Sequence, residues 1–219
     1  MLNRTITRMA AIAATATLGA SMLLVSSPAS AHPAVNNSGT TSLQAAFTAD
    51  GDQFDSSWND FDIATELTAA VLAAKPGSQL SVVTNGQVPL TAFVPNDRAF
   101  RKFVKDLSGH KPATEAAAYN AILDRAGIDK VERLLLSQIV PNVTLRARNL
   151  RHMDGAILGT MGGSAIKVRV LRHRMARIVI VDRDRNDQNA WLVFFKRNIN
   201  KGNRQIAQGV DRVIRPVDL

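Results

Sequence analysis

Hydrophobic residues change their spacing along this chain, from a helical period in the first half to short strand-like runs in the second. In residues 60–72 the apolar positions fall on one side of a helix, which Pro76 and Gly77 end. Residues 80–83 predict a short strand, and Asn85 with Gly86 predicts the turn after it. The chain therefore becomes regular from about residue 60 onward.

Two more helices are predicted in the middle of the chain. Residues 114–126 are rich in alanine and close at Gly127. Asp129 is suited to cap a second helix that runs to Ile139, before Pro141 breaks the pattern.

After Asn142 the pattern is that of β-strands. Short apolar and β-branched runs alternate with turn-forming residues, and strands are predicted at 155–158, 166–171, 177–181, 191–195 and 210–214. Helices followed by strands indicate an α+β domain.

The stretch from Leu90 to Phe100 joins a buried strand to a helix. Pro95 lacks a backbone donor and ends the strand, and Asn96 or Asp97 can cap a helix that begins near Arg98. The apolar residues of that helix share one face and are Phe100, Phe103, Val104 and Leu107.

The order of residues in this junction resembles the first signature of the fasciclin domain family. That signature reads Thr, a hydrophobic residue, Phe, Ala, Pro, Ser or Thr, Asp or Asn, any residue, Ala, Phe. Val94 stands where Ala is usual, and the matching positions are Thr91, Phe93, Pro95, Asn96, Asp97, Ala99 and Phe100. Residues 60–72 are similar to the family's opening helix, and residues 208–219 are similar to its closing segment.

The resemblance implies a β-sheet wedge flanked by helices and a role in adhesion or matrix contact outside the cell. It implies no shared catalytic residues, and we expect no enzyme and no cofactor. The chain departs from the family where a Tyr-His pair is usual, because Ser137 and Gln138 stand there. Gln208 replaces a usual Asn, and Asp211 lies near the place of a usual His.

Residues 1–31 are typical of a signal peptide. Arg4 and Arg8 form a positive start, residues 9–25 are mostly small and apolar, and Ala29-Ser30-Ala31 matches a cleavage site. An uncleaved membrane helix is the alternative, which the Thr and Ser residues in the apolar run disfavour. We expect cleavage after Ala31 and a secreted or cell-envelope-associated protein, without a transmembrane anchor after cleavage. The short Arg-led signal suggests a bacterial source.

Residues 32–57 are polar and aperiodic, and they predict a flexible leader before a single fasciclin-like domain at residues 58–219. The chain has no cysteine, so burial of a core rather than disulfide bonds must stabilise it.

Positive charge is concentrated in the strand half. Residues 143–219 hold 16 Lys and Arg against 6 Asp and Glu, whereas residues 32–142 hold 9 against 12. Lys167 and Arg169 should share the exposed face of one strand. A solvated face is the simple interpretation. The alternative is a surface that docks acidic envelope or matrix polymers, such as anionic polysaccharide or lipid headgroups, or other surface proteins.

The candidate binding residues combine the junction with this basic stripe, and they are Asn96, Asp97, Lys167, Arg169, Arg172 and Arg174. Nucleic acid is not expected, because no aromatic residues alternate with the cations and the chain carries an export signal.

Oxygen-bearing side chains at alternate positions, as in the first half of a calcium loop, are found at Asp182, Asp184, Asn186 and Asp187. The twelfth position of that loop is Val193 instead of Glu, so a polar hairpin turn is favoured over a cation site. The four histidines lack the spacing of a metal pair, and no metal site is predicted.

Three functions remain open at this point. The first is a secreted binding or adhesion module, and the second is an extracellular carrier of a small apolar ligand in a cleft. The third is an unrecognised hydrolase, although the chain has no G-x-S-x-G motif.

The signal segment gives a direct prediction. N-terminal sequencing of the exported protein should begin at His32, because cleavage after Ala31 follows from the Ala29-Ser30-Ala31 site. Recovery of a membrane-embedded species that keeps residues 1–31 would contradict it.

Overall fold

The structure is a computed structural model, and it describes residues 38–49, 51, 54–172, 176–184 and 187–215. These residues belong to one compact unit. The predicted signal peptide at 1–31 and the candidate residue Arg174 lie outside the described residues. None of the helices among the described residues is long and apolar enough to cross a membrane.

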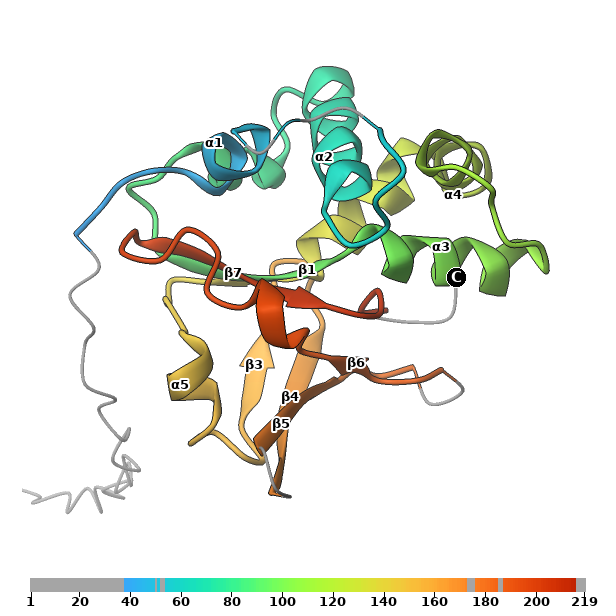
Figure 1. The fold of residues 1–219 in the computed structure, drawn as a ribbon. Helices are drawn as coiled ribbons and strands as arrows, with labels where there is room; N and C mark the ends of the chain where they lie inside the picture. The colour runs from blue at the N-terminus through green and yellow to red at the C-terminus, as the bar shows by residue number, and fades with distance from the viewer. Residues whose placement is uncertain (1–37, 50, 52–53, 173–175, 185–186, 216–219) are drawn as a thin grey trace, which may run out of the picture. The chain divides into compact units, whose positions relative to one another are not determined.

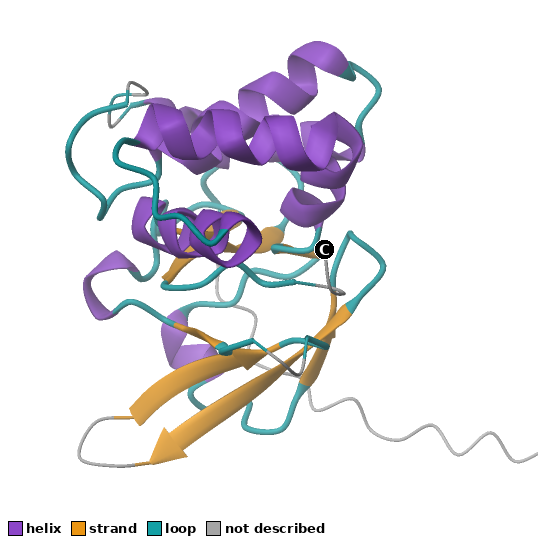
Figure 2. Ribbon diagram, turned by 90° about the vertical axis from the view of Figure 1, so that its right-hand side faces the viewer, coloured by secondary structure: helices purple, strands orange, loops and turns teal. Residues whose placement is uncertain are grey.

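The helices α1 to α4 gather on one side of the unit, whereas α5 lies beside β3 on the other (Figures 1 and 2). The first helices in chain order are α1 (Leu43–Thr48), α2 (Asp62–Ala74) and the 3₁₀ helix η1 (Gln79–Thr84). The longer helices that follow are α3 (Asp97–Ser108) and α4 (Glu115–Leu136). Two short elements complete the set, α5 (Ala147–Leu150) and the 3₁₀ turn η2 (Phe194–Lys196).

The strands form two sheets. The three-stranded sheet has the order β2-β1-β7 and consists of β1 (Leu90–Pro95), β2 (Ile139–Pro141) and β7 (Gln205–Val210). β1 pairs antiparallel with β2 and parallel with β7. The antiparallel sheet has the order β3-β4-β5-β6 and consists of β3 (Ile157–Gly159), β4 (Ala165–Arg172), β5 (Ala176–Val181) and β6 (Ala190–Trp191).

Two hydrophobic cores lie on the two faces of the three-stranded sheet. Alternate residues of β1 divide between them, because successive side chains of a strand point to opposite faces. Ala92 and Val94 pack into the core under α2, α3 and α4, whereas Phe93 packs with Val168 and Ile180 of the four-stranded sheet. The α+β architecture predicted from the sequence is confirmed.

The predicted strand-helix junction is present as expected. β1 ends at Pro95, and Asn96 Oδ1 accepts a hydrogen bond from Ala99 N at 2.9 Å, so Asn96 is the cap of α3. Asp97 has a different task from the one predicted. Its Oδ1 accepts from Ile63 N at 2.8 Å and its Oδ2 from Asp62 N at 3.2 Å, so Asp97 satisfies the start of α2.

The two predicted middle helices form one element with a kink. Gly127 lies inside α4 with φ 69° and ψ 164°, a conformation that glycine adopts readily. The sequence predicts Asp129 as the cap of the second half. In the structure its Oδ1 accepts instead from Nζ of Lys75, the residue that follows α2, at 2.8 Å.

The strand predicted at 80–83 is wrong, since this stretch is the 3₁₀ helix η1. Ser78 Oγ accepts from Leu80 N at 3.1 Å and caps it. Leu80 and Val83 are both buried, and their spacing of three residues matches the 3₁₀ repeat.

The last two strands are also misplaced by the sequence. The run at 191–195 contributes only its start to β6 and then turns into η2. The final strand is β7, at 205–210, rather than 210–214. The sequence pattern missed it because the polar residues Gln205 and Gln208 are not typical of a core strand. Both are fully buried and hydrogen-bonded.

Part of the stretch predicted as a flexible leader, residues 32–57, is folded. Helix α1 falls inside it, and Leu43 is 2% exposed with its backbone N–H donating to Gln205 Oε1 at 2.8 Å. Gly39 forms a bridge with Asn203. Residues 39–48 therefore pack on the domain, whose folded part begins before residue 58.

Two substitutions at the junction should differ in cost. Phe100→Ala should reduce the free energy of unfolding by about 3–5 kcal/mol, because the ring is fully buried and its removal leaves a cavity. Asn96→Ala should cost about 0.5–2 kcal/mol through loss of the α3 cap. Urea unfolding of both variants tests this, and equal, negligible losses would show that the junction does not organise the fold.

Candidate binding surface

The two junction residues predicted to bind a partner are not on the surface. Asn96 is 5% exposed and Asp97 is 0% exposed, and both use their side-chain oxygens to cap helices. A macromolecule cannot reach them, so this part of the predicted site is corrected. Their role is to position α2 and α3.

The basic stripe on β4 has the predicted geometry. Lys167 and Arg169 are exposed, and Val168 between them points inward because the strand alternates. Arg172 is exposed at the end of β4, where the alternation places it on the opposite face of the strand from Lys167 and Arg169. We call these three basic residues, Lys167, Arg169 and Arg172, the β4 stripe. Arg169 Nε lies 3.9 Å from Asp154 Oδ1, a solvent-exposed ion pair that contributes little stability.

An exposed aromatic turn is the part of the surface that the sequence analysis missed. Phe195 is 90% exposed and Phe194 is 53% exposed, and their rings meet edge to face at 5.0 Å. The predicted strand at 191–195 would have buried one of the two. The sequence does contain a signal, which is two consecutive Phe residues followed by Lys196 and Arg197. Cations directly after a strand's last apolar residues indicate that the chain turns to the surface there, and exposed apolar area beside them marks an interaction surface.

The sheet beneath holds this turn in place. Val193 N donates to Gly209 O at 2.8 Å, which anchors η2 to β7. A Cβ on Gly209 would lie 2.7 Å from Lys196 Cβ, so only glycine permits this close approach. Asn198, just after the turn, accepts from Ala147 N at 2.8 Å and so ties α5 to the same region.

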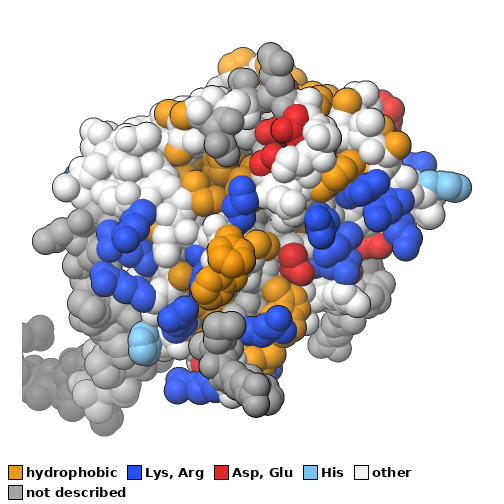
Figure 3. All heavy atoms as spheres, viewed as in Figure 1, with side chains coloured by type: hydrophobic (Ala, Val, Ile, Leu, Met, Phe, Trp, Pro, Cys, Tyr) orange, Lys and Arg blue, Asp and Glu red, His pale blue; other side chains and the backbone are white. Residues whose placement is uncertain are grey.

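Cations surround the aromatic pair. The Arg197 guanidinium lies 4.1 Å from the centroid of the Phe194 ring, and its Nε donates to Phe194 O at 2.9 Å. Partial burial lowers the pKa of Arg197, and the charge of Arg151 lowers it further. The two guanidinium groups are therefore close enough to repel each other electrostatically. Figure 3 shows hydrophobic side chains gathered at the position of η2, with Lys and Arg side chains on both sides of them. We call residues 194–197 and Arg151 the aromatic turn.

The acidic stretch after β5 surrounds an arginine. Arg215 N donates to Asp182 Oδ2 at 2.7 Å, and Arg215 Nε lies 3.6 Å from Asp184 Oδ2. Its Nη2 also pairs with Asp187 and Asp106. Burial raises the pKa of Asp182. The predicted polar hairpin turn is thus held by Arg215, which occupies the place that a bound cation would take.

An apolar cavity of about 60 Å³ lies between α1, α2, η1 and the three-stranded sheet. Pockets for small ligands are typically about 300–1,000 Å³, so this cavity is of the size of a packing gap. Its lining includes Leu43, Phe47 and Val94.

Comparison with known proteins agrees with this architecture. A family model described as the fasciclin domain matches residues 63–216, and the chain belongs to this family. Fasciclin domains are generally associated with adhesion or binding and are typically not enzymes. The family resemblance seen in the sequence is thereby confirmed.

One similar solved structure is titled "Novel Fold Revealed by the Structure of a FAS1 Domain Pair from the Insect Cell Adhesion Molecule Fasciclin I". It is 12% identical with a TM-score of 0.43, and the match covers 70% of this chain and 43% of that chain. The chain thus spans less than half the length of that structure. No curated protein matches the chain.

Arg215 gives a test of the acidic stretch. Arg215→Gln should cost about 3–5 kcal/mol in the free energy of unfolding, because it removes a largely buried guanidinium that pairs with Asp106, Asp184 and Asp187 at once. Arg212→Gln is the matched control, since Arg212 makes an exposed hydrogen bond to Gln188 and should cost below about 1 kcal/mol. Similar costs for the two variants in urea unfolding would contradict the assignment.

Proposed function

We propose that this fasciclin-domain protein is exported and acts as a binding or adhesion module for acidic polysaccharides of the cell envelope or surrounding matrix. The observation that supports this most directly is the exposed β4 stripe together with the aromatic turn, in the half of the chain that carries 16 Lys and Arg against 6 Asp and Glu. Such a surface attracts polyanions over roughly 8–10 Å at moderate salt.

A linear polymer suits the β4 stripe better than a compact partner does. Lys167 and Arg169 lie two residues apart on one strand, a spacing of about 6.6 Å, so they can contact successive charged units of a chain. The exposed rings of Phe194 and Phe195 add flat apolar surfaces against which sugar rings can pack. Lipid headgroups and acidic surface proteins share part of this chemistry, and they become outcomes of the test.

The remaining alternatives have less support. A carrier of a small apolar ligand would use an enclosed apolar pocket. The apolar cavity beside α1 measures about 60 Å³, and the larger hollow of about 620 Å³ between Pro76, Glu132 and Gly162 is open to solvent and partly polar. The proposal assigns no reaction and no cofactor to the chain. Secretion and cleavage after Ala31 are part of the proposal, and they agree with the extracellular or surface occurrence of fasciclin domains.

The test uses the β4 stripe. A variant with Lys167→Gln, Arg169→Gln and Arg172→Gln should bind immobilised alginate, a carboxylated polysaccharide, about 10- to 100-fold more weakly than the wild type. Its melting temperature should change by no more than about 1–3 °C, because exposed charges contribute little to stability. Binding of the wild type should also fall steeply between about 0.05 and 0.5 M salt.

A matched control separates the stripe from net charge. Lys111→Gln, Arg125→Gln and Lys130→Gln removes the same charge from exposed positions on the helical half, and it should leave alginate binding nearly unchanged. Phe195→Ser should weaken binding without changing its salt dependence. Equal losses in both triple variants would contradict the stripe as a docking surface. Retention on anionic lipid vesicles but not on alginate would contradict polysaccharide as the ligand.

A further inference from the structure

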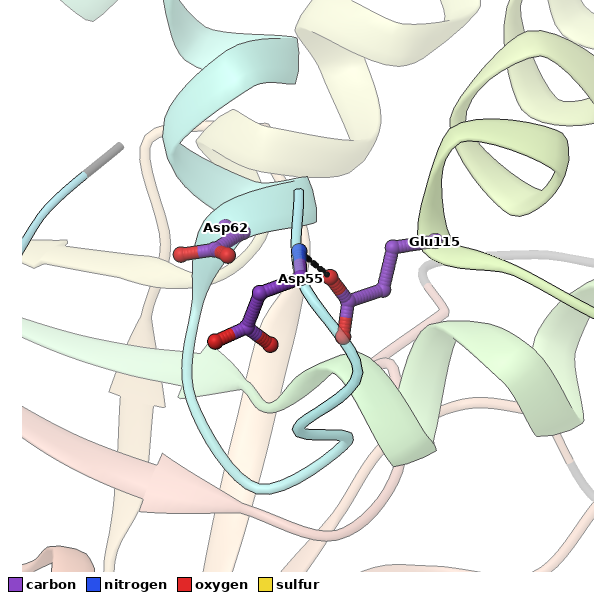
Figure 4. Close-up of side chains that lie close together, drawn as sticks. All are labelled: Asp55, Asp62 and Glu115. Atoms are coloured by element: carbon purple, nitrogen blue, oxygen red, sulfur yellow. Dashed lines mark hydrogen bonds between the residues drawn. The ribbon is translucent and has the colours of Figure 1, made fainter. Parts of the chain in front are cut away.

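Five carboxylates gather where the loop before α2 meets the first turns of α2, α3 and α4. The acid oxygens of Asp55, Asp62 and Glu115 lie within 4.8 Å of one another, and so do those of Asp60, Asp97 and Glu115. Figure 4 shows the first three side chains coming together between α2 and α4. We call these five residues the acid cluster.

Local structure fixes these side chains. Asp62, Asp97 and Glu115 are the first residues of α2, α3 and α4, and all three are buried. Asp55 N donates to Glu115 Oε2 at 2.8 Å, which closes the loop over the cluster (Figure 4). Asp55 itself is exposed, so the cluster opens to solvent on that side.

Two oxygens in the cluster have no hydrogen-bond donor among the described residues. Glu115 is 0% exposed, and its Oε1 is buried without a partner. Asp60 Oδ1 is buried in the same condition. The ion pairs within the described part of the chain include none with Asp60, Asp97 or Glu115. A buried carboxylate oxygen without a donor or counter-charge is costly, and here two of them belong to one cluster.

A positive charge bound among these carboxylates would stabilise their ionised forms. Burial raises the pKa of Asp97 to about 9, and the neighbouring carboxylates of Asp60 and Glu115 raise it further. Burial also raises the pKa of Glu115 to about 7. Each helix N-terminus supplies only about half an elementary charge, and the N–H groups that open α2 already bond to Asp97.

We propose that the acid cluster binds one divalent cation of the Ca²⁺ type, with Asp60, Asp97 and Glu115 as carboxylate ligands and Asp55 at the mouth. Ca²⁺ bonds to oxygen at about 2.4 Å, so ligand oxygens up to about 4.8 Å apart can share one ion, whereas Mg²⁺ requires a tighter set at about 2.1 Å. The bound ion would connect the starts of three helices. None of these residues belongs to the β4 stripe or the aromatic turn, so the proposal does not depend on polysaccharide binding.

The test is a Ca²⁺ titration of the chelator-treated mature protein at pH 8 and constant ionic strength, followed by calorimetry and thermal melting. At Ca²⁺ of about 100 times Kd, the melting temperature should rise by about 5–10 °C. Glu115→Gln should weaken Ca²⁺ binding at least about tenfold, because it removes the negative charge of the carboxylate whose Oε1 has no hydrogen-bond partner. Asp124→Asn, an exposed acid on α4 outside the cluster, is the control and should bind Ca²⁺ like the wild type.

Two further measurements keep the proposal testable if Glu115→Gln does not fold. Asp55→Asn changes an exposed residue at the mouth and should weaken binding several-fold without unfolding the protein. Tb³⁺ replacing Ca²⁺ should show emission sensitised by Trp58, which lies two residues before Asp60, and Trp58→Phe should remove that emission whereas Trp191→Phe should not. The proposal is overturned if Ca²⁺ changes the melting temperature no more than NaCl of equal ionic strength does. It is also overturned if acidification raises the melting temperature while calorimetry detects no Ca²⁺ binding at pH 8.

Discussion

One pair of residues, Asn96 and Asp97, holds the helical half to the central sheet. Asn96 directly follows β1 and caps α3, while the side chain of Asp97 accepts from the first two N–H groups of α2. Buried backbone groups at helix ends must find partners, and here two helix starts find them at the end of one strand. This contact places the starts of α2 and α3 beside the end of β1, against which the larger hydrophobic core packs.

Sequence reasoning succeeded where the signal is local. The strand-proline-cap-helix order of the junction and the alternation of β4 depend on neighbouring residues, and both appear as predicted. It failed where partners are distant in the chain. Gln205 and Gln208 are residue types common in loops. In the fold their side-chain amides donate to backbone carbonyls of η1 and of the segment just before α5, which allows both residues to be buried. The exposure of Phe195 and the acid cluster likewise depend on which segments the fold brings together, which no local period encodes.

The two halves of the domain carry different chemistry. The helical half holds the acid cluster and a slight excess of acidic residues, whereas the strand half exposes the β4 stripe and the aromatic turn. The three-stranded sheet separates them, with one hydrophobic core on each face. A change at one surface must pass through this packed layer to affect the other, so the two surfaces can act independently.

The parallel pairing of β1 with β7 has a consequence for how the chain folds. Leu90 pairs with Gln205, and Pro95 pairs with Val210, so the central strand gains its parallel partner only after almost the whole chain is available. Contacts between such distant segments close large loops and slow folding. During synthesis the core around β1 therefore stays incomplete until residues 205–210 have emerged, and a nascent chain that ends before them leaves one edge of its central strand without a partner.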